Sequence, residues 1–414
     1  IHRQSQVVIS LRPGEQVRRI EHWAQQWRQV AAPLGMLARR LLGRHEALGL
    51  FESEHFRDYV WRDLFARTLP VSDFDALARS SFRVARVPWN AMHLGGLLTR
   101  RLGRAVYPRL DTRGYDVMIA ETPYPGEVAW GTRLVVRYHD AIPLLMPHTI
   151  TDKVFHQAAH YNALLRNVRS GAWFACVSDA TRQDLLRLFP ELEPRTVTIH
   201  NMVSHHYHAE EDCTPERIHE IVRTRRNMQV HGEVKGADGP VVKSADEPAD
   251  YLLMVSTVEP RKNHATLLAA WEQLRVERYP NLKLIIVGGL GWDHGPIVKR
   301  FHPWLGRGAV QFLEEVPAAE LRLLYRHARA TVCPSFGEGF DFSGIEAMRC
   351  GGAVIASDIP VHRDVFGDAC EYFDTYDSQD LAQAITRVVD PLDPAAMARQ
   401  AELVALGERV SARY

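Results

Sequence analysis

The chain has 414 residues, no formal net charge and 46% hydrophobic residues. This length exceeds what one ordinary hydrophobic core organises, so two domains are expected. Zero net charge and the lack of interleaved aromatic and basic residues argue against a nucleic-acid partner. Without a run of 18 apolar residues or a recognisable secretory signal, a cytoplasmic protein is expected.

Charge is unevenly distributed along the chain. Residues 1–200 hold 27 Lys and Arg against 19 Asp and Glu, so the first half is basic and the remainder acidic. A basic first domain could attract an anionic lipid-linked acceptor or the inner-membrane surface, giving peripheral contact on its cytoplasmic face. An ordinary solvated surface explains the imbalance equally well.

Cysteine and histidine patterns predict neither a disulfide framework nor a metal. The five cysteines are odd in number and scattered, which indicates reduced thiols. No C-x-x-C or H-E-x-x-H pattern occurs. His205, His206 and His208 lie in a polar stretch and are interpreted as surface residues. We therefore expect no metal and no cofactor.

Residues 1–205 are expected to form the first domain. Its first hundred residues suggest helices, for example Val17–Val30 and Pro33–Leu42. Two apolar runs then predict strands, Arg133–Tyr138 leading into His139, and Trp173–Val177. Residues 206–248 are polar and aperiodic, which predicts a linker with a mobile loop.

The second domain is expected over residues 249–393. Tyr251–Ser256 is a buried strand, and Arg261 and Lys262 follow it before a helix that begins near Thr266. Ligands bind at this carboxyl end of strands in α/β sheets, and adjacent cations suit a diphosphate. A solvated basic turn is the alternative interpretation.

Further strands alternate with helices in this domain. Lys283–Val287, Ala309–Leu313 and Ala353–Ala356 are apolar runs, and Ala319–His327 has helical periodicity. Such alternation predicts a parallel, doubly wound sheet, that is, an α/β fold. Pro391 and Pro394 break the pattern before a last helix, which belongs to residues 394–414.

The stretch from Ala328 to Gly352 combines a strand, a glycine-bearing loop and a helix start. Ser343 is predicted to be the N-cap, with Glu346 at capping-box spacing. A helix N-terminus favours an anion, while Glu338 and Glu346 can accept hydrogen bonds from sugar hydroxyls. The combination describes a sugar-nucleotide site, although a plain cap and a solvated loop charge remain the alternative.

These motifs together resemble retaining glycosyltransferase family 4. The likeness lies in VSTVEPRKNHATLL, IIVGGLGW, PSFGEGFDFSGIEAMRCGG and ASDIPVHRDVFGDA, and it covers residues 250 to 390 densely. It implies the GT-B fold, two Rossmann-like domains facing across a cleft, with the last helix packing back toward the first domain. The chain is similar to bacterial polysaccharide mannosyltransferases.

The resemblance implies a role for each matching residue. Glu338 and His139 would contact the donor sugar, Glu346 the ribose, and Arg261 with Lys262 the diphosphate. Backbone groups from Gly339 to Phe342 would lie against sugar and phosphate, and the loop at Val316 would border the base. The nucleotide-sugar donor would be GDP-mannose or a UDP-sugar, and the acceptor a glycan or a lipid-linked oligosaccharide.

Two departures from the family pattern stand out. Asp341, Phe342 and Ser343 occupy positions where family members commonly have glycine, a leucine-like residue and proline. The glycine-rich loop expected in the first domain is not evident, and His93–Gly96 is the candidate for it. A phosphorylase or epimerase and a non-catalytic glycan-binding scaffold remain alternatives to a transferase.

Overall fold

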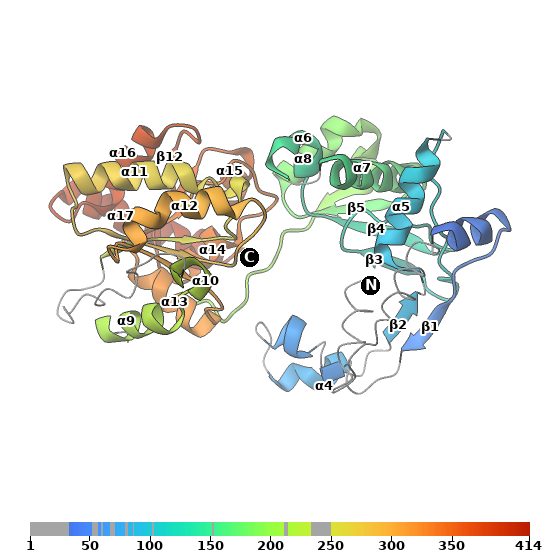
Figure 1. The fold of residues 1–414 in the computed structure, drawn as a ribbon, viewed down its shortest axis with the longest axis horizontal. Helices are drawn as coiled ribbons and strands as arrows, with labels where there is room; N and C mark the ends of the chain where they lie inside the picture. Colours follow the sequence, from blue (N-terminus) through green and yellow to red (C-terminus); the bar gives the residue numbers. More distant parts are fainter. Residues whose placement is uncertain are drawn as a thin grey trace. The chain divides into compact units, whose positions relative to one another are not determined.

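The computed structural model describes residues 33–51, 57–58, 61–66, 71–78, 82–85, 87–101, 103–150, 153–210, 214–232 and 250–414. The chain divides into two compact units (Figure 1). The first comprises residues 1–147, 152–177 and 181–199, and the second comprises residues 148–151, 178–180 and 200–414. The helix predicted at Val17–Val30 and most of the predicted mobile loop lie outside the described residues.

The first unit is built on a parallel sheet with the strand order β3-β4-β5-β6. Its strands are β3 (Val117–Ala120), β4 (Arg133–Tyr138), β5 (Trp173–Cys176) and β6 (Thr196–Thr198). The strand predicted at Arg133–Tyr138 is confirmed with the same bounds, and the one at Trp173 ends one residue earlier than expected. A separate antiparallel pair joins β1 (Leu48–Phe51) to β2 (Phe82–Ala85).

Helices flank these strands in the first unit. Residues 33–41 are helical, as predicted. The other helices are η1 (Trp61–Phe65), η2 (Val71–Asp73), α4 (Phe74–Ala78), α5 (Trp89–Arg100), α6 (Ile142–Leu145), α7 (Lys153–Arg169), α8 (Asp179–Leu188) and η4 (Pro190–Arg195). The short helix η3 (Pro147–Thr149) begins at the last residue of the first segment of this unit and continues into the second unit.

Burial alternates along β4 of this sheet. Leu134, Val136 and Phe174 join Leu164 and Val168 of α7 in one core, so this face of the sheet is covered by helix. The opposite face carries side chains that are about half exposed among the described residues: Val117, Ile119, Trp173 and Val197.

The candidate glycine-rich loop of the first domain proves to be helix. His93–Gly96 lies inside α5, where the glycines permit close packing. A Cβ on Gly95 would lie 2.3 Å from the Met36 side chain, and one on Gly96 would lie 2.4 Å from the Tyr107 ring. These glycines therefore serve helix packing, and the prediction of a ligand loop here is wrong.

The second unit contains a six-stranded parallel sheet with the order β12-β11-β10-β7-β8-β9. The doubly wound sheet predicted from the alternating pattern is confirmed. Its strands are β7 (Tyr251–Val255), β8 (Lys283–Val287), β9 (Val310–Leu313), β10 (Ala330–Cys333), β11 (Val354–Ser357) and β12 (Glu371–Phe373). Five of them, β7 to β11, are buried along almost their whole length. The burial predicted for the strand at Tyr251–Ser256 is therefore confirmed.

Helices cover this sheet (Figure 1). They are η5 (Pro260–Lys262), α11 (His264–Glu277), α12 (His294–Leu305), α13 (Ala318–His327), α14 (Phe342–Arg349), α15 (Pro360–Phe366), α16 (Ser378–Val389) and α17 (Pro394–Ser411). The last helix packs on α14 and α16 within this unit. Its packing toward the first domain stays a prediction.

The segment expected to be a linker contains two helices, α9 (Pro215–Thr224) and α10 (Met228–Gly232). Ile218 and Ile221 of α9 are buried at helical spacing. Among the described residues, no helix is both long and apolar enough to cross a bilayer.

Candidate active site

The predicted donor residues follow two adjacent central strands of the second unit. Arg261 and Lys262 come after β7, and Glu338 comes after β10, which pairs with β7. From β7 the chain continues to β8 and β9 on one side of the sheet. It then returns to β10, β11 and β12 on the other side of β7. The strand order therefore reverses between β7 and β10, the position where open α/β sheets bind ligands at their carboxyl edge.

The loop after β7 is anchored to the loop after β10. Asn263 adopts a left-handed conformation with φ of 58°, and its side-chain amide donates to the carbonyls of Pro334 and Thr375, both at 3.0 Å. The backbone N–H of Phe336 donates to the Arg261 carbonyl at 2.9 Å. These contacts hold the basic pair against the glycine-bearing loop.

Glu338 is held by both predicted cations. Its Oε2 accepts from Arg261 at 2.6 Å and its Oε1 accepts from Lys262 at 2.6 Å. Arg261 also donates to the Gly337 carbonyl at 2.7 Å and to Glu259 at 2.8 Å. The structure thus brings Arg261, Lys262 and Glu338 together in one buried ionic network.

Glu338 and Lys262 each stabilise the ionised form of the other. Burial opposes ionisation of Glu338, but the charges of Lys262 and Arg261 outweigh it and hold the pKa of Glu338 below its usual value. Burial works against the charge of Lys262 as well, yet Glu338 raises the pKa of this ammonium group. Burial raises the pKa of Glu259. Glu338 and Lys262 therefore stay ionised near neutral pH.

The start of α14 differs from the prediction. Asp341, not Ser343, is the N-cap, and its Oδ1 accepts from the Ser343 backbone N–H at 3.0 Å and from the Ser343 hydroxyl at 2.6 Å. Both residues are good caps, so the capping-box spacing pointed to the wrong one. The predicted capping box with Glu346 is therefore absent, and one N–H of the helix start is already occupied by Asp341.

A buried histidine fixes the other oxygen of Asp341. Oδ2 lies 3.1 Å from Nε2 of His362, whose Nδ1 lies 2.8 Å from the Ser357 carbonyl. Burial opposes ionisation of Asp341, but hydrogen bonding and charge from His362, with Lys262 and Ser343 contributing, hold its pKa well below the usual range. Asp341 thus ties the site loop to β11 and α15.

Glu346 lies on α14 in a less polar environment. Its Oε2 accepts from the Tyr325 hydroxyl at 2.9 Å. Burial raises the pKa of Glu346 to about 7, although hydrogen bonds from Tyr325 and Tyr207 oppose the rise. Glu346 is therefore half ionised near neutral pH, unlike Glu338.

The remaining predicted residues are placed as follows. Gly339 and Phe340 are buried, Phe342 is 42% exposed, and the Phe340 and Phe342 rings meet edge to face at 5.1 Å. Val316 is half-buried in the loop after β9. His139 belongs to the first unit, where it follows β4 with its Nε2 3.7 Å from the Glu121 carboxylate.

Three polar residues of this site were not singled out from the sequence. Glu259 and His362 contact Arg261 and Asp341, and Tyr325 contacts Glu346. His362 is 21 positions from Asp341, and Tyr325 is 21 positions from Glu346. A buried carboxylate needs a hydrogen-bond donor. The prediction of acidic residues beside buried strands could therefore have directed a search for such partners.

Part of the second unit matches a known protein family. A family model described as "Glycosyl transferases group 1" matches residues 240–402. The matched residues make up less than half of the chain and are similar to this family. Arg261, Lys262, Glu338, Asp341 and Glu346 all lie within the matched range.

Two relatives from Escherichia coli share part of the chain. "O-antigen chain mannosyltransferase B" is 29% identical over 238 residues, 57% of this chain and 56% of that protein. "Serotype-specific mannosyltransferase WbdA" is 37% identical over 139 residues, 33% of this chain and 17% of that protein. The chain therefore spans about half the length of the first relative and far less of the second.

Solved structures share the fold at low identity. The crystal structure of Anabaena Alr3699/HepE in complex with UDP and glucose matches with a TM-score of 0.51 and 17% identity, over 79% of this chain and 72% of that chain. Together with the parallel sheets in both units, this match confirms the GT-B fold predicted from the sequence. Membership of family 4 within this fold stays a prediction.

Proposed function

We propose that the protein is a retaining, metal-independent glycosyltransferase that moves mannose from GDP-mannose to a glycan or lipid-linked acceptor. The match to the group 1 glycosyltransferase family and the mannosyltransferase relatives support the reaction class and the sugar. One observation carries the site assignment: Arg261 and Lys262 meet Glu338 where the strand order of the sheet reverses.

The ion pairs suggest how the donor is received. Two cations, Arg261 and Lys262, face two carboxylates, Glu259 and Glu338, so the network is close to neutral. An incoming diphosphate would compete with Glu338 for both cations. The Glu338 oxygens released in this way could accept hydrogen bonds from the sugar hydroxyls.

Catalysis would rest on charge stabilisation and positioning. As the bond between the sugar and the diphosphate breaks, negative charge develops on the leaving phosphate oxygens, and Arg261 and Lys262 stabilise it. Glu338 orients the sugar, and the acceptor hydroxyl attacks from the side of the leaving group, which retains the anomeric configuration. His139 is the contribution proposed for the first unit.

Asp341 would act by positioning. Both of its oxygens are engaged within the chain, by Ser343 and by His362. It would therefore set the path of the loop from Glu338 to Ser343 without binding the sugar. Phe342, which is more exposed, would lie against the donor.

Metal independence follows in this proposal from the two cations, which supply the positive charge that the diphosphate needs. Within the described part of the chain, one group of possible metal ligands is found, Asp179, His200 and Asp364. None of these is a proposed donor residue. Full transferase activity after chelation with EDTA would support this part of the proposal, and its loss would contradict it.

Two assays test the function. A thermal-shift panel of GDP-, UDP-, ADP- and dTDP-sugars should give the largest stabilisation with GDP-mannose, because a bound ligand raises stability by mass action. Mannose transfer should fall about 100-fold or more in Glu338→Gln. Glu408→Gln is the matched control, since Glu408 is an exposed residue of α17. Phosphate-dependent release of mannose 1-phosphate would instead indicate a phosphorylase, and no shift with any nucleotide would indicate a scaffold.

A further inference from the structure

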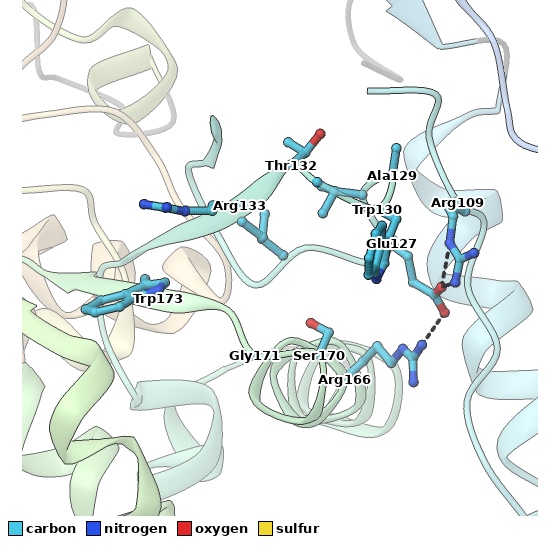
Figure 2. Close-up of a pocket in the computed structure, with 13 residues that line it drawn as sticks. Arg109, Glu127, Ala129, Trp130, Thr132, Arg133, Arg166, Ser170, Gly171 and Trp173 are labelled. Atoms are coloured by element: carbon cyan, nitrogen blue, oxygen red, sulfur yellow. Dashed lines mark hydrogen bonds and ion pairs between the residues drawn. The ribbon is translucent and has the colours of Figure 1, made fainter. Parts of the chain in front are cut away.

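The first unit contains a cavity of about 420 Å³ that the proposed transfer reaction does not use (Figure 2). Its wall is formed by the loop before β4, the first residues of β4 and β5, and the end of α7. His139 follows the other end of β4, and six residues of strand span about 20 Å. The cavity therefore lies on the edge of this sheet opposite to His139.

The cavity is strongly cationic for its size. Arg109, Arg133 and Arg166 line it, and Glu127 is the one carboxylate among its lining residues. Glu127 is buried and already accepts from Arg109 at 2.7 Å, from Arg40 at 3.0 Å and from Arg166. A single carboxylate cannot neutralise this many guanidinium groups, so positive charge remains for a ligand.

Two arginine groups in the wall retain hydrogen-bonding capacity. Arg133 is exposed, and within the described residues its guanidinium has no hydrogen-bond or ion-pair partner. The Nε of Arg166 is buried without a partner among the described residues. A second cavity of about 300 Å³ shares Arg166 and adds Arg100, Arg104 and Arg169. The positive charge thus extends beyond the first cavity.

Two indole rings border the same cavity. Trp130 is fully exposed within the described part of the chain, and Trp173 is 48% exposed. Figure 2 shows Trp173 beside Arg133, and Trp130 near Glu127. A large aromatic ring in water is unfavourable, and its negative π face attracts the C–H face of a sugar ring. The Ser170 hydroxyl donates to the Asn167 carbonyl at 2.9 Å, and its oxygen can accept a hydrogen bond from a sugar hydroxyl.

We propose that this cavity is a second, non-catalytic site for an anionic saccharide, a sugar that carries a phosphate or a carboxylate. Guanidinium groups recognise either anion through paired hydrogen bonds. The indole rings distinguish a saccharide from a simple anion, because only the saccharide offers an apolar ring face. The recessed shape favours a sugar over a flat bilayer. This inference goes beyond the transfer reaction and does not depend on it.

The test titrates the full chain and follows binding by calorimetry and by the indole N–H signals in NMR spectra. Mannose 6-phosphate and glucuronic acid are the two anionic probes, and they separate the phosphate from the carboxylate source. Methyl α-mannoside and inorganic phosphate are the single-feature probes. At least one anionic sugar should bind saturably and at least ten times more tightly than either single-feature probe.

Variants locate the binding. Trp130→Ala and Arg133→Ala, both at exposed positions, should each weaken it at least tenfold. Arg113→Ala is the matched control and should leave it unchanged, since Arg113 is an exposed arginine of the same unit that pairs with Asp111 outside the cavity. Unchanged melting temperatures would show that the variants are folded.

Several outcomes would overturn the proposal. These are the absence of saturable binding by either anionic sugar, equal affinity for inorganic phosphate, and equal affinity in Trp130→Ala and Arg133→Ala. Binding to phosphatidylglycerol vesicles that is lost in Trp130→Ala, without binding of any sugar, would instead identify a membrane surface.

Discussion

Each unit of the protein buries a carboxylate among cations, and the two clusters differ in their charge balance. Glu127 of the first unit contacts three arginines, Arg40, Arg109 and Arg166. Glu338 of the second unit contacts Arg261 and Lys262, and Glu259 balances the second positive charge. Both carboxylates are equally buried, with 7% of the side chain exposed.

The charge balance of each cluster determines which ligands it can bind. A balanced network can exchange one anion for another, as a donor diphosphate requires when it binds and leaves. A cluster with surplus cations maintains a positive field, which suits the retention of an anionic ligand without chemistry. Burial alone does not separate these roles, whereas the ratio of cations to carboxylates does.

The largest effect on stability is expected at Glu127. Glu127→Ala leaves three guanidinium groups close together without their shared carboxylate, so the free energy of unfolding of the first unit should fall by about 3–5 kcal/mol. Urea denaturation measures it. Glu121→Ala is the control, because Glu121 is 82% exposed. Equal stability of the two variants would show that Glu127 does not hold the cluster together.

A smaller loss is expected at the start of α14. Asp341→Ala removes the helix cap, which costs about 1 kcal/mol, and also leaves His362 buried without its carboxylate. We expect a total loss of about 2–3 kcal/mol in the free energy of unfolding. Asp393→Ala removes the cap of α17 alone and should cost about 1 kcal/mol. Equal losses of unfolding free energy in the two variants would show that the contact with His362 adds no stability.

The smallest effect concerns pH and Glu346. Burial raises the pKa of Glu346 from 4.5 to about 7 in the folded chain. The contribution of protonated Glu346 to the free energy of unfolding is therefore complete below pH 4.5 and is lost as the pH rises through 7. Ribose hydroxyls would donate to the ionised form. Nucleotide affinity should therefore rise with pH through about 7, by roughly tenfold if binding lowers the pKa by one unit.

Calorimetry with GDP across this pH range measures the effect, and proton release on binding should accompany it. Glu346→Gln should remove the pH dependence near 7. A pH profile that is the same in both proteins would place the ribose elsewhere.

The sequence revealed the second unit more fully than the first, for a physical reason. Strands such as Lys283–Val287 are buried along almost their whole length, so they are visible as continuous apolar runs. The pairing of Arg40 with Glu127 joins residues 87 positions apart, and no local pattern encodes it. The helix α9 was missed because its segment was judged by polarity, although Ile218 and Ile221 have helical spacing.

The candidate site was predictable in its residue types but not in its contacts. Arg261, Lys262 and Glu338 were identified because cations and carboxylates follow strands of a parallel sheet. That Glu338 pairs with both cations depends on β7 lying beside β10, which the order of strands along the chain does not reveal. The N-cap of α14 was assigned to Ser343 instead of Asp341. The contact that holds the Asp341 carboxylate comes from His362, which is distant in sequence, so no local pattern shows it.

The affinity for GDP-mannose in Lys262→Gln measures whether the cations after β7 bind the donor diphosphate. Lys299→Gln is the matched control, because Lys299 is an exposed lysine of α12 in the same unit. Calorimetry should show at least tenfold weaker binding for Lys262→Gln and wild-type affinity for Lys299→Gln, with both proteins folded. Wild-type affinity in Lys262→Gln would show that this cation does not bind the diphosphate.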